Sequence, residues 1–197
     1  MNEIPPTHAR RQLHTRQVSC TGYLRDDGLI DIEGRLLDTK ANDHQSVERM
    51  IPAGEPCHLM HLRLTVDLDF VIREVKAVTE AAPLSGCNQI TPAYQALVGL
   101  RIGPGFTRQV NLRVGGVRGC THLTELLGPM ATTLFQTASG LRRQAELERA
   151  AREPGFDPAQ PFFIGTCHTF HPEGEAAQAL DQRWQEENLI AKRSHDQ

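Results

Sequence analysis

Two segments in which apolar and polar residues alternate constrain the fold of this chain most strongly. In the first, from Arg16 to Lys40, apolar residues take alternate positions on both sides of Asp26-Asp27-Gly28. In the second, from His58 to Val78, two further runs of this kind are separated by Asp67-Leu68-Asp69. A period of two is typical of strands with one buried face, and an Asp-Gly pair favours a tight turn. The sequence therefore predicts two β-hairpins, separated by a loop at 41–56.

Helical patterns dominate the second half of the chain. The longest runs from about Thr121 to Arg152, with apolar residues three and four positions apart. A shorter helix is expected from Phe106 to Val114, and another from Pro92 to about Leu100. Phe162-Phe163-Ile164 is expected to form a buried strand or anchor. Together these patterns predict an α+β fold, in which an antiparallel sheet of two hairpins packs against several helices.

The length of 197 residues suits one domain with extensions. Residues 1–15 are expected to form a flexible N-terminal arm, 16–170 a single α+β domain and 171–197 a polar helical tail. The net charge of −3 argues against nucleic acid and anionic membranes as partners. No apolar run approaches the roughly 20 residues that span a bilayer, and the N-terminus lacks the apolar core of a signal peptide. A cytoplasmic protein is therefore expected.

A thiol and an imidazole stand two residues apart where the long helix begins, at Cys120 and His122. Backbone N–H groups at a helix start favour the thiolate form of a cysteine. Such a pair suits either a metal site or a reactive Cys–His couple, while the structural alternative is a buried cysteine with a helix-capping histidine. Glu125, one turn later, is expected to support the site rather than to bind metal itself.

Other cysteines and histidines fall at the ends of predicted elements, where side chains can converge. The chain has five cysteines, an odd number that argues against a disulfide framework. Cys57 and His58 point to opposite sides of a strand, so at most one of them joins a site, whereas His14 is expected to be solvated. The leading hypothesis is a zinc ion or iron–sulfur cluster. Its expected ligands are Cys87, Cys120, His122 and one of His58, Cys167 or His168.

Two alternatives belong to other functional classes. In an enzyme, Cys120 would act as a nucleophile activated by His122 or His168. Side chains two apart at a helix start normally diverge, which would make His122 a poor base unless the first turn of the helix is irregular. In an interaction module, the cysteines would be core residues and the polar tail would bind a partner protein. Sequence alone does not separate these readings.

Several long stretches resemble a bacterial family known only as a domain of unknown function. They are HTRQVSCTGYLRDDGLIDIEGRLLDTK at 14–40, LRLTVDLDFVIREVKAVTEAAPLSGC at 62–87, IGPGFTRQVNLRVGGVRGCTHLTELLGPMATT at 102–133 and GTCHTF at 165–170. This resemblance covers most of the chain and implies no particular activity.

The middle of the chain also resembles the iron–sulfur cluster assembly scaffold of the IscU/NifU type. The strand MHLRLTVD at 60–67 matches the family's first strand, and Val71 to Val75 matches its second. By this resemblance the family's ligands fall at His58 (or Cys57, with a one-residue shift), at Cys87 and at Cys120. The chain departs from the family around Cys87 and in placing its cysteine before His122. The resemblance implies a scaffold-like core and a role as scaffold or carrier.

Overall fold

A computed structural model gives the structure of residues 7–153, 155–158, 161 and 163–193. The chain divides into two compact units, one ending at Thr137 and one beginning at Ala138, and each is described by itself. Residues 1–6 of the expected arm lie outside the described residues. The expected division into arm, domain and tail stays a prediction.

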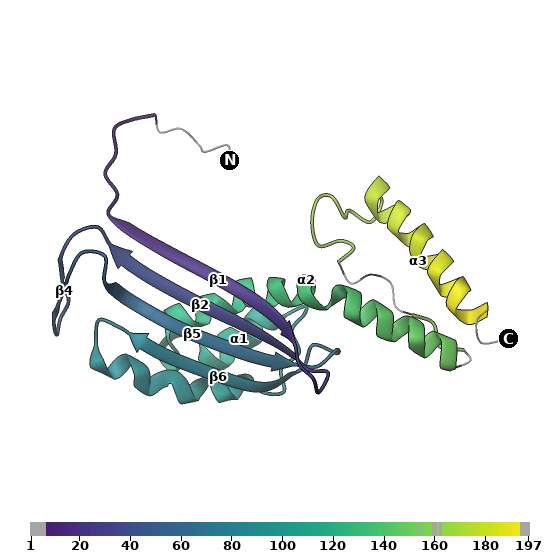
Figure 1. Ribbon diagram of the computed structural model, residues 1–197, viewed down its shortest axis with the longest axis horizontal. Helices are drawn as coiled ribbons and strands as arrows, with labels where there is room; N and C mark the ends of the chain where they lie inside the picture. The colour runs from purple at the N-terminus through teal and green to yellow at the C-terminus, as the bar shows by residue number, and fades with distance from the viewer. Residues whose placement is uncertain (1–6, 154, 159–160, 162, 194–197) are drawn as a thin grey trace. The chain divides into compact units, whose positions relative to one another are not determined.

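The first unit is built on a four-stranded antiparallel sheet with strand order β1-β2-β5-β6 (Figure 1). Both predicted hairpins are confirmed, and the first turns at Gly28, whose φ of 80° glycine adopts without strain. A small separate pair, β3 with β4, forms where only a loop was expected. The strands are β1 (His14–Leu24), β2 (Ile30–Lys40), β3 (His44–Gln45), β4 (Met50–Ile51), β5 (Pro56–Val66) and β6 (Ile72–Ala81).

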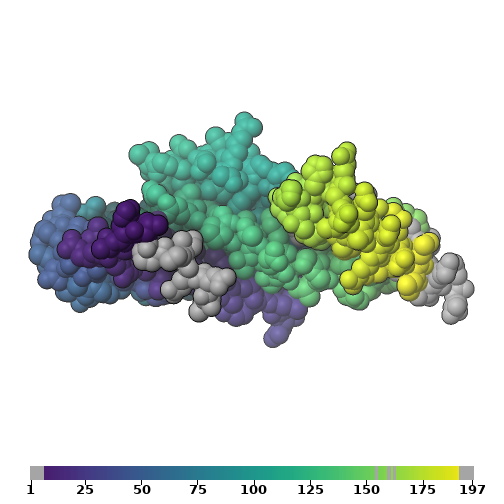
Figure 2. Space-filling view, turned by 90° about the horizontal axis from the view of Figure 1, so that it is seen from above, coloured from purple at the N-terminus to yellow at the C-terminus, as the bar shows by residue number. Residues whose placement is uncertain are grey.

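One face of this sheet forms the core of the first unit. Ile32, Leu36 and Leu64 on that face have no exposed surface. The opposite face carries polar side chains, among them the exposed Glu33 and Lys76. In the space-filling view, the teal atoms of the segment that contains α1 (Phe106–Val114) gather on one side of the purple N-terminal atoms (Figure 2). Phe106, Val110 and Val114 of this helix are buried, as are the apolar residues of the sheet.

The long helix α2 (Thr121–Arg152) has the predicted bounds. Its first part packs on the apolar face of the sheet. Leu123, Leu126 and Met130 of this helix are completely buried. Gly34 of β2 allows the helix to approach, because a Cβ atom at this position would lie 2.6 Å from the sulfur of Met130. This contact sets how close the helix lies to the sheet.

The segment before α1 differs from the prediction. Residues Ser85–Leu97 form a 3₁₀ helix, η1, with Pro92 in its interior instead of in the first turn of an α-helix. Pro92 has no N–H group to donate, so a regular α-helical ladder is interrupted here. Contacts with β6 hold the segment instead, including a 2.6 Å hydrogen bond from the Gln95 amide to the carbonyl oxygen of Val75. A short 3₁₀ turn, η2 (Gly116–Arg118), leads from α1 to α2.

The second unit contains the rest of α2 and the helix α3 (Glu175–Arg193). Arg143 of α2 lies 3.9 Å from the ring centre of Trp184, and its Nε donates to Glu187 at 3.1 Å. The predicted strand at 162–164 is wrong for the residues described: Phe163 and Ile164 lie in turns, and Phe162 lies outside the described residues. Turn hydrogen bonds between residues three apart, such as that from the Ile164 N–H to the Pro161 carbonyl oxygen, fold this segment into turns. None of the helices in the described part of the chain combines the length and the hydropathy of a membrane-spanning segment.

Candidate metal centre

A buried carboxylate, Asp38, lies at the end of the apolar face of β2. It has no exposed surface. Arg16 stands directly opposite on β1, with its Nε 2.8 Å from Oδ1 and a terminal nitrogen 2.7 Å from Oδ2. His14, which was expected to be solvated, has its Nε2 3.2 Å from Oδ1. A buried charge is unfavourable unless it is paired, so these partners allow β2 to end in a carboxylate.

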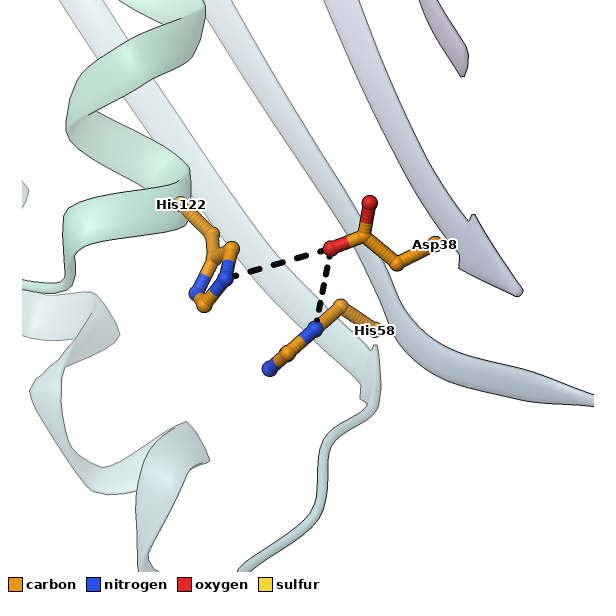
Figure 3. A group of neighbouring side chains, drawn as sticks. All are labelled: Asp38, His58 and His122. Carbon is orange, nitrogen blue, oxygen red and sulfur yellow. Dashed lines mark hydrogen bonds and ion pairs between the residues drawn. The ribbon is translucent and has the colours of Figure 1, made fainter. Parts of the chain in front are cut away.

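Two histidines approach Asp38 from other elements (Figure 3). His58 is the register partner of Asp38 on β5, and its Nδ1 lies 3.0 Å from Oδ2. His122 stands in the first turn of α2, and its Nε2 lies 3.9 Å from the same oxygen. The two imidazole rings are stacked, with centres 3.7 Å apart and 27° between their planes. One possible ligand atom from each of the three residues lies within 4.8 Å of the other two.

The electrostatics of the group favour an ionised carboxylate beside a neutral imidazole. Burial alone raises the pKa of Asp38, but Arg16 and then His58 outweigh it and lower the pKa to about 2. Burial lowers the pKa of His58 and the neighbouring His122 lowers it further, against a smaller opposing effect of Asp38. An ionised carboxylate and a neutral imidazole are the forms that bind metal.

Cys120 lies just before α2 and close to His122. Its Sγ is 4.0 Å from His122 Nδ1, so the side chains converge and the expected divergence is wrong. Cys120 precedes the helix and its carbonyl oxygen accepts the first intrahelical hydrogen bond, from Thr124. Burial raises the pKa of the thiol, but His122 and the backbone N–H groups of Leu123 and His122 together lower it below the usual 9.0.

The structure brings together three of the residues predicted to bind metal, namely His58, Cys120 and His122. Cys87 lies in η1 and does not belong to the group around Asp38. Cys167 and His168 are exposed residues of the second unit. Participation of these last three in a site stays a prediction.

Asp38 and Arg16 were not identified from the sequence. Asp38 continues the row of Ile30, Ile32, Gly34 and Leu36 at a spacing of two, which places a charged residue at a core position. A charge at a buried position is a recognisable sign of a functional or paired group. Arg16 gives no such sign, because its role depends on the register between β1 and β2.

The chain was compared with protein-family models, with curated proteins and with solved structures, and a family model matches. No curated protein matches the chain significantly, and no solved structure does so either. A family model described as "Protein of unknown function (DUF2889)" matches residues 14–136. The chain belongs to the DUF2889 family. The predicted membership of a family of unknown function is thereby confirmed, while the IscU/NifU resemblance is not shown and stays a prediction.

The DUF2889 match contains the whole cluster around Asp38. Arg16, His58, Cys120 and His122 all fall within residues 14–136, whereas Cys167 and His168 follow the matched segment. The Asp38 cluster is therefore a feature of the DUF2889 part of the chain.

Proposed function

We propose that this DUF2889 protein binds a divalent transition-metal ion, with zinc as the first candidate, through Asp38, His58 and His122. The observation that carries the proposal is the convergence of two imidazoles and one carboxylate from β2, β5 and α2, with ligand atoms within 4.8 Å of one another. Two histidines and one carboxylate are a frequent ligand set for zinc and for iron(II).

The distances suit an ion of this size. Zinc lies about 2.0–2.1 Å from nitrogen and carboxylate ligands, which separates tetrahedral ligands by roughly 3.3 Å. The separations of Asp38 Oδ2 from His58 Nδ1, 3.0 Å, and from His122 Nε2, 3.9 Å, bracket that value. The stacked rings direct their in-plane lone pairs nearly side by side, so binding requires them to tilt apart. Loss of the ring stack is therefore an expected signature of metal binding.

Three protein ligands leave a further coordination position open, as in catalytic and transport sites rather than closed structural ones. The side chains of His58 and His122 are 18% and 25% exposed, so an ion can enter and leave. An open coordination position that solvent can reach supports the expected role as a metal carrier, and it equally suits an enzyme that activates a metal-bound water for hydrolysis. An iron–sulfur cluster is less well supported, because it needs about four thiolates, whereas the group of ligand atoms around Asp38 in the described residues consists of one carboxylate and two imidazoles.

The test is a titration of chelator-treated protein with Zn²⁺ and with Co²⁺ as a visible probe. We expect one ion per chain with a Kd of about 1 µM or tighter. Asp38→Asn and His58→Gln should each weaken binding by at least about 100-fold, because even supporting residues around a metal contribute about 10- to 100-fold.

The matched control is His61→Gln. His61 is on the same strand as His58 but on the opposite face, 3.3 Å from Glu80. It should leave the affinity unchanged. Equal affinities of wild type, Asp38→Asn and His61→Gln would refute the proposal.

A second candidate function is a thiol enzyme. His122 lies between Cys120 and Asp38, with Nδ1 4.0 Å from the thiol and Nε2 3.9 Å from the carboxylate. This order of thiol, imidazole and carboxylate is that of a nucleophile with its base and orienting group. In an enzyme of this kind, iodoacetamide at neutral pH should alkylate Cys120 much faster than Cys87. Equal rates would argue against it.

A further inference from the structure

A second group of ligand atoms lies behind His122, on the side away from Asp38. The sulfur atoms of Cys120 and Met60 are 3.9 Å apart, and the Cys120 sulfur is 4.0 Å from Nδ1 of His122. Met60 follows His58 by two residues on β5, so the two side chains share the face that meets α2. One strand thus supplies His58 and Met60, and the start of one helix supplies Cys120 and His122.

These spacings match those of a three-coordinate ion. With metal–sulfur bonds of about 2.3 Å and metal–nitrogen bonds of about 2.0 Å, planar trigonal ligands lie roughly 4.0 Å apart for two sulfurs and roughly 3.7 Å for sulfur and nitrogen. The observed sulfur–sulfur distance of 3.9 Å and sulfur–nitrogen distance of 4.0 Å are close to these values. Both distances that involve the Cys120 sulfur therefore already suit such an ion.

The identity of the ligands indicates which ion. A thioether is a soft, uncharged ligand, and thiolate with thioether selects monovalent copper over the harder divalent ions. We propose that Met60, Cys120 and His122 form a Cu(I) site, distinct from the Asp38–His58–His122 set and sharing only His122 with it. Binding replaces the thiol proton of Cys120 by Cu(I), releases that proton to solvent and changes no oxidation state.

The surroundings support this assignment. Met60 has no exposed surface and Cys120 is partly buried, which gives a poorly hydrated site. The buried Tyr94 hydroxyl accepts a hydrogen bond from the Cys120 N–H at 3.1 Å and donates to its carbonyl oxygen at 2.8 Å. If Nδ1 of His122 bound copper, its Nε2–H group would face Asp38. A carboxylate in this place commonly orients a metal-bound histidine. The backbone that carries the Cys120 thiol is therefore held in position before any ion arrives.

The test is a titration of reduced protein with Cu(I) under anaerobic conditions, in competition with the chromogenic chelator bicinchoninate. We expect one tightly bound Cu(I) per chain. X-ray absorption should show two sulfur ligands and one nitrogen ligand. Met60→Leu, which nearly conserves side-chain volume, should weaken Cu(I) binding at least tenfold, and Cys120→Ser should abolish the tight site.

Two controls make the result specific. Met130→Leu changes another fully buried methionine of the same core, and Cys87→Ser removes a thiol outside the cluster. Both should bind Cu(I) like wild type. Wild-type Cu(I) affinity in Met60→Leu, or copper held equally well after Cys120→Ser, would overturn the proposal. Zinc binding by Met60→Leu should stay within twofold of wild type, so failure of this site and failure of the Asp38 site are measured separately.

Discussion

Arg16 binds both carboxylate oxygens of Asp38, through Nε at 2.8 Å and a terminal nitrogen at 2.7 Å. The other terminal nitrogen of Arg16 contacts the carboxylate of Glu125 in α2. A single guanidinium therefore joins the edge strand β1, the buried end of β2 and the first turns of the long helix. It orients Asp38, and it also places a fixed positive charge where the proposed metal ion would bind.

Arg16→Gln is expected to tighten zinc binding about tenfold while lowering the Tm. A unit charge and a divalent ion about 4 Å apart repel by about 8 kcal/mol at an effective dielectric constant of 20, and looser orientation of Asp38 offsets most of this gain. Calorimetric titration of the chelator-treated variant measures the affinity. Arg35→Gln, on the opposite face of β2, is the matched control and should bind zinc like wild type. Weaker binding by Arg16→Gln would show that positioning of Asp38 outweighs repulsion.

Acid should destabilise the metal-free protein through Asp38. Its pKa lies at about 2 in the fold against 3.8 for a free side chain. The unfolded chain therefore takes up a proton at higher pH than the folded one. The stabilisation, roughly 2 kcal/mol, is complete above about pH 5 and disappears as the pH falls through 3.8 toward 2. Urea unfolding in the presence of a chelator should show this loss in wild type and a shallower dependence in Asp38→Asn. Parallel curves for the two proteins would contradict it.

Local patterns were sufficient to predict most of the first unit. The two hairpins and the helix from Thr121 to Arg152 each carry a signal within their own residues, namely alternation, an Asp-Gly turn or helical spacing. The 3₁₀ helix around Pro92 and the turns at Phe163 were missed because packing and local hydrogen bonds decide them, and short apolar runs are ambiguous.

In the candidate site, too, some residues could be recognised from the sequence and others could not. His58, Cys120 and His122 were identifiable because imidazoles and thiols at element ends are conspicuous in a sequence. Arg16 and Met60 belong to the clusters only through strand register and through the contact of β5 with α2. A methionine in an alternating strand has the same pattern as any core residue, so its proximity to Cys120 could be found only in three dimensions.

The contact between Gly34 and Met130 should be sensitive to a single methyl group. A Cβ at Gly34 would lie 2.6 Å from the sulfur and 2.9 Å from Cγ of Met130, so Gly34→Ala should destabilise the protein by about 1–3 kcal/mol. Adding Met130→Ala should recover part of this loss, which a double-mutant cycle measures by urea unfolding. Gly128→Ala is the control, because its Cβ would meet nothing within 4 Å and should favour the helix. Additive effects of Gly34→Ala and Met130→Ala would contradict the close contact.

Tyr94→Phe should destabilise the start of α2, although Tyr94 itself lies outside that helix. The Tyr94 hydroxyl bonds the N–H and the carbonyl oxygen of Cys120 and lies 2.8 Å from the hydroxyl of Thr124. Its removal leaves a partly buried N–H without its partner, so the free energy of unfolding should fall by about 1–3 kcal/mol. Because the same bonds hold Cys120 in place, Cu(I) affinity should fall as well.

The control for this change is Tyr23→Phe, which removes a hydroxyl from a tyrosine that is 49% exposed. Surface changes of this kind usually alter stability by no more than about 0.5 kcal/mol. Urea unfolding of both variants, followed by Cu(I) titration, compares them directly. If Tyr94→Phe is as stable as Tyr23→Phe and binds Cu(I) equally well, the hydroxyl does not position Cys120. In that case the backbone of α2 alone fixes the thiol.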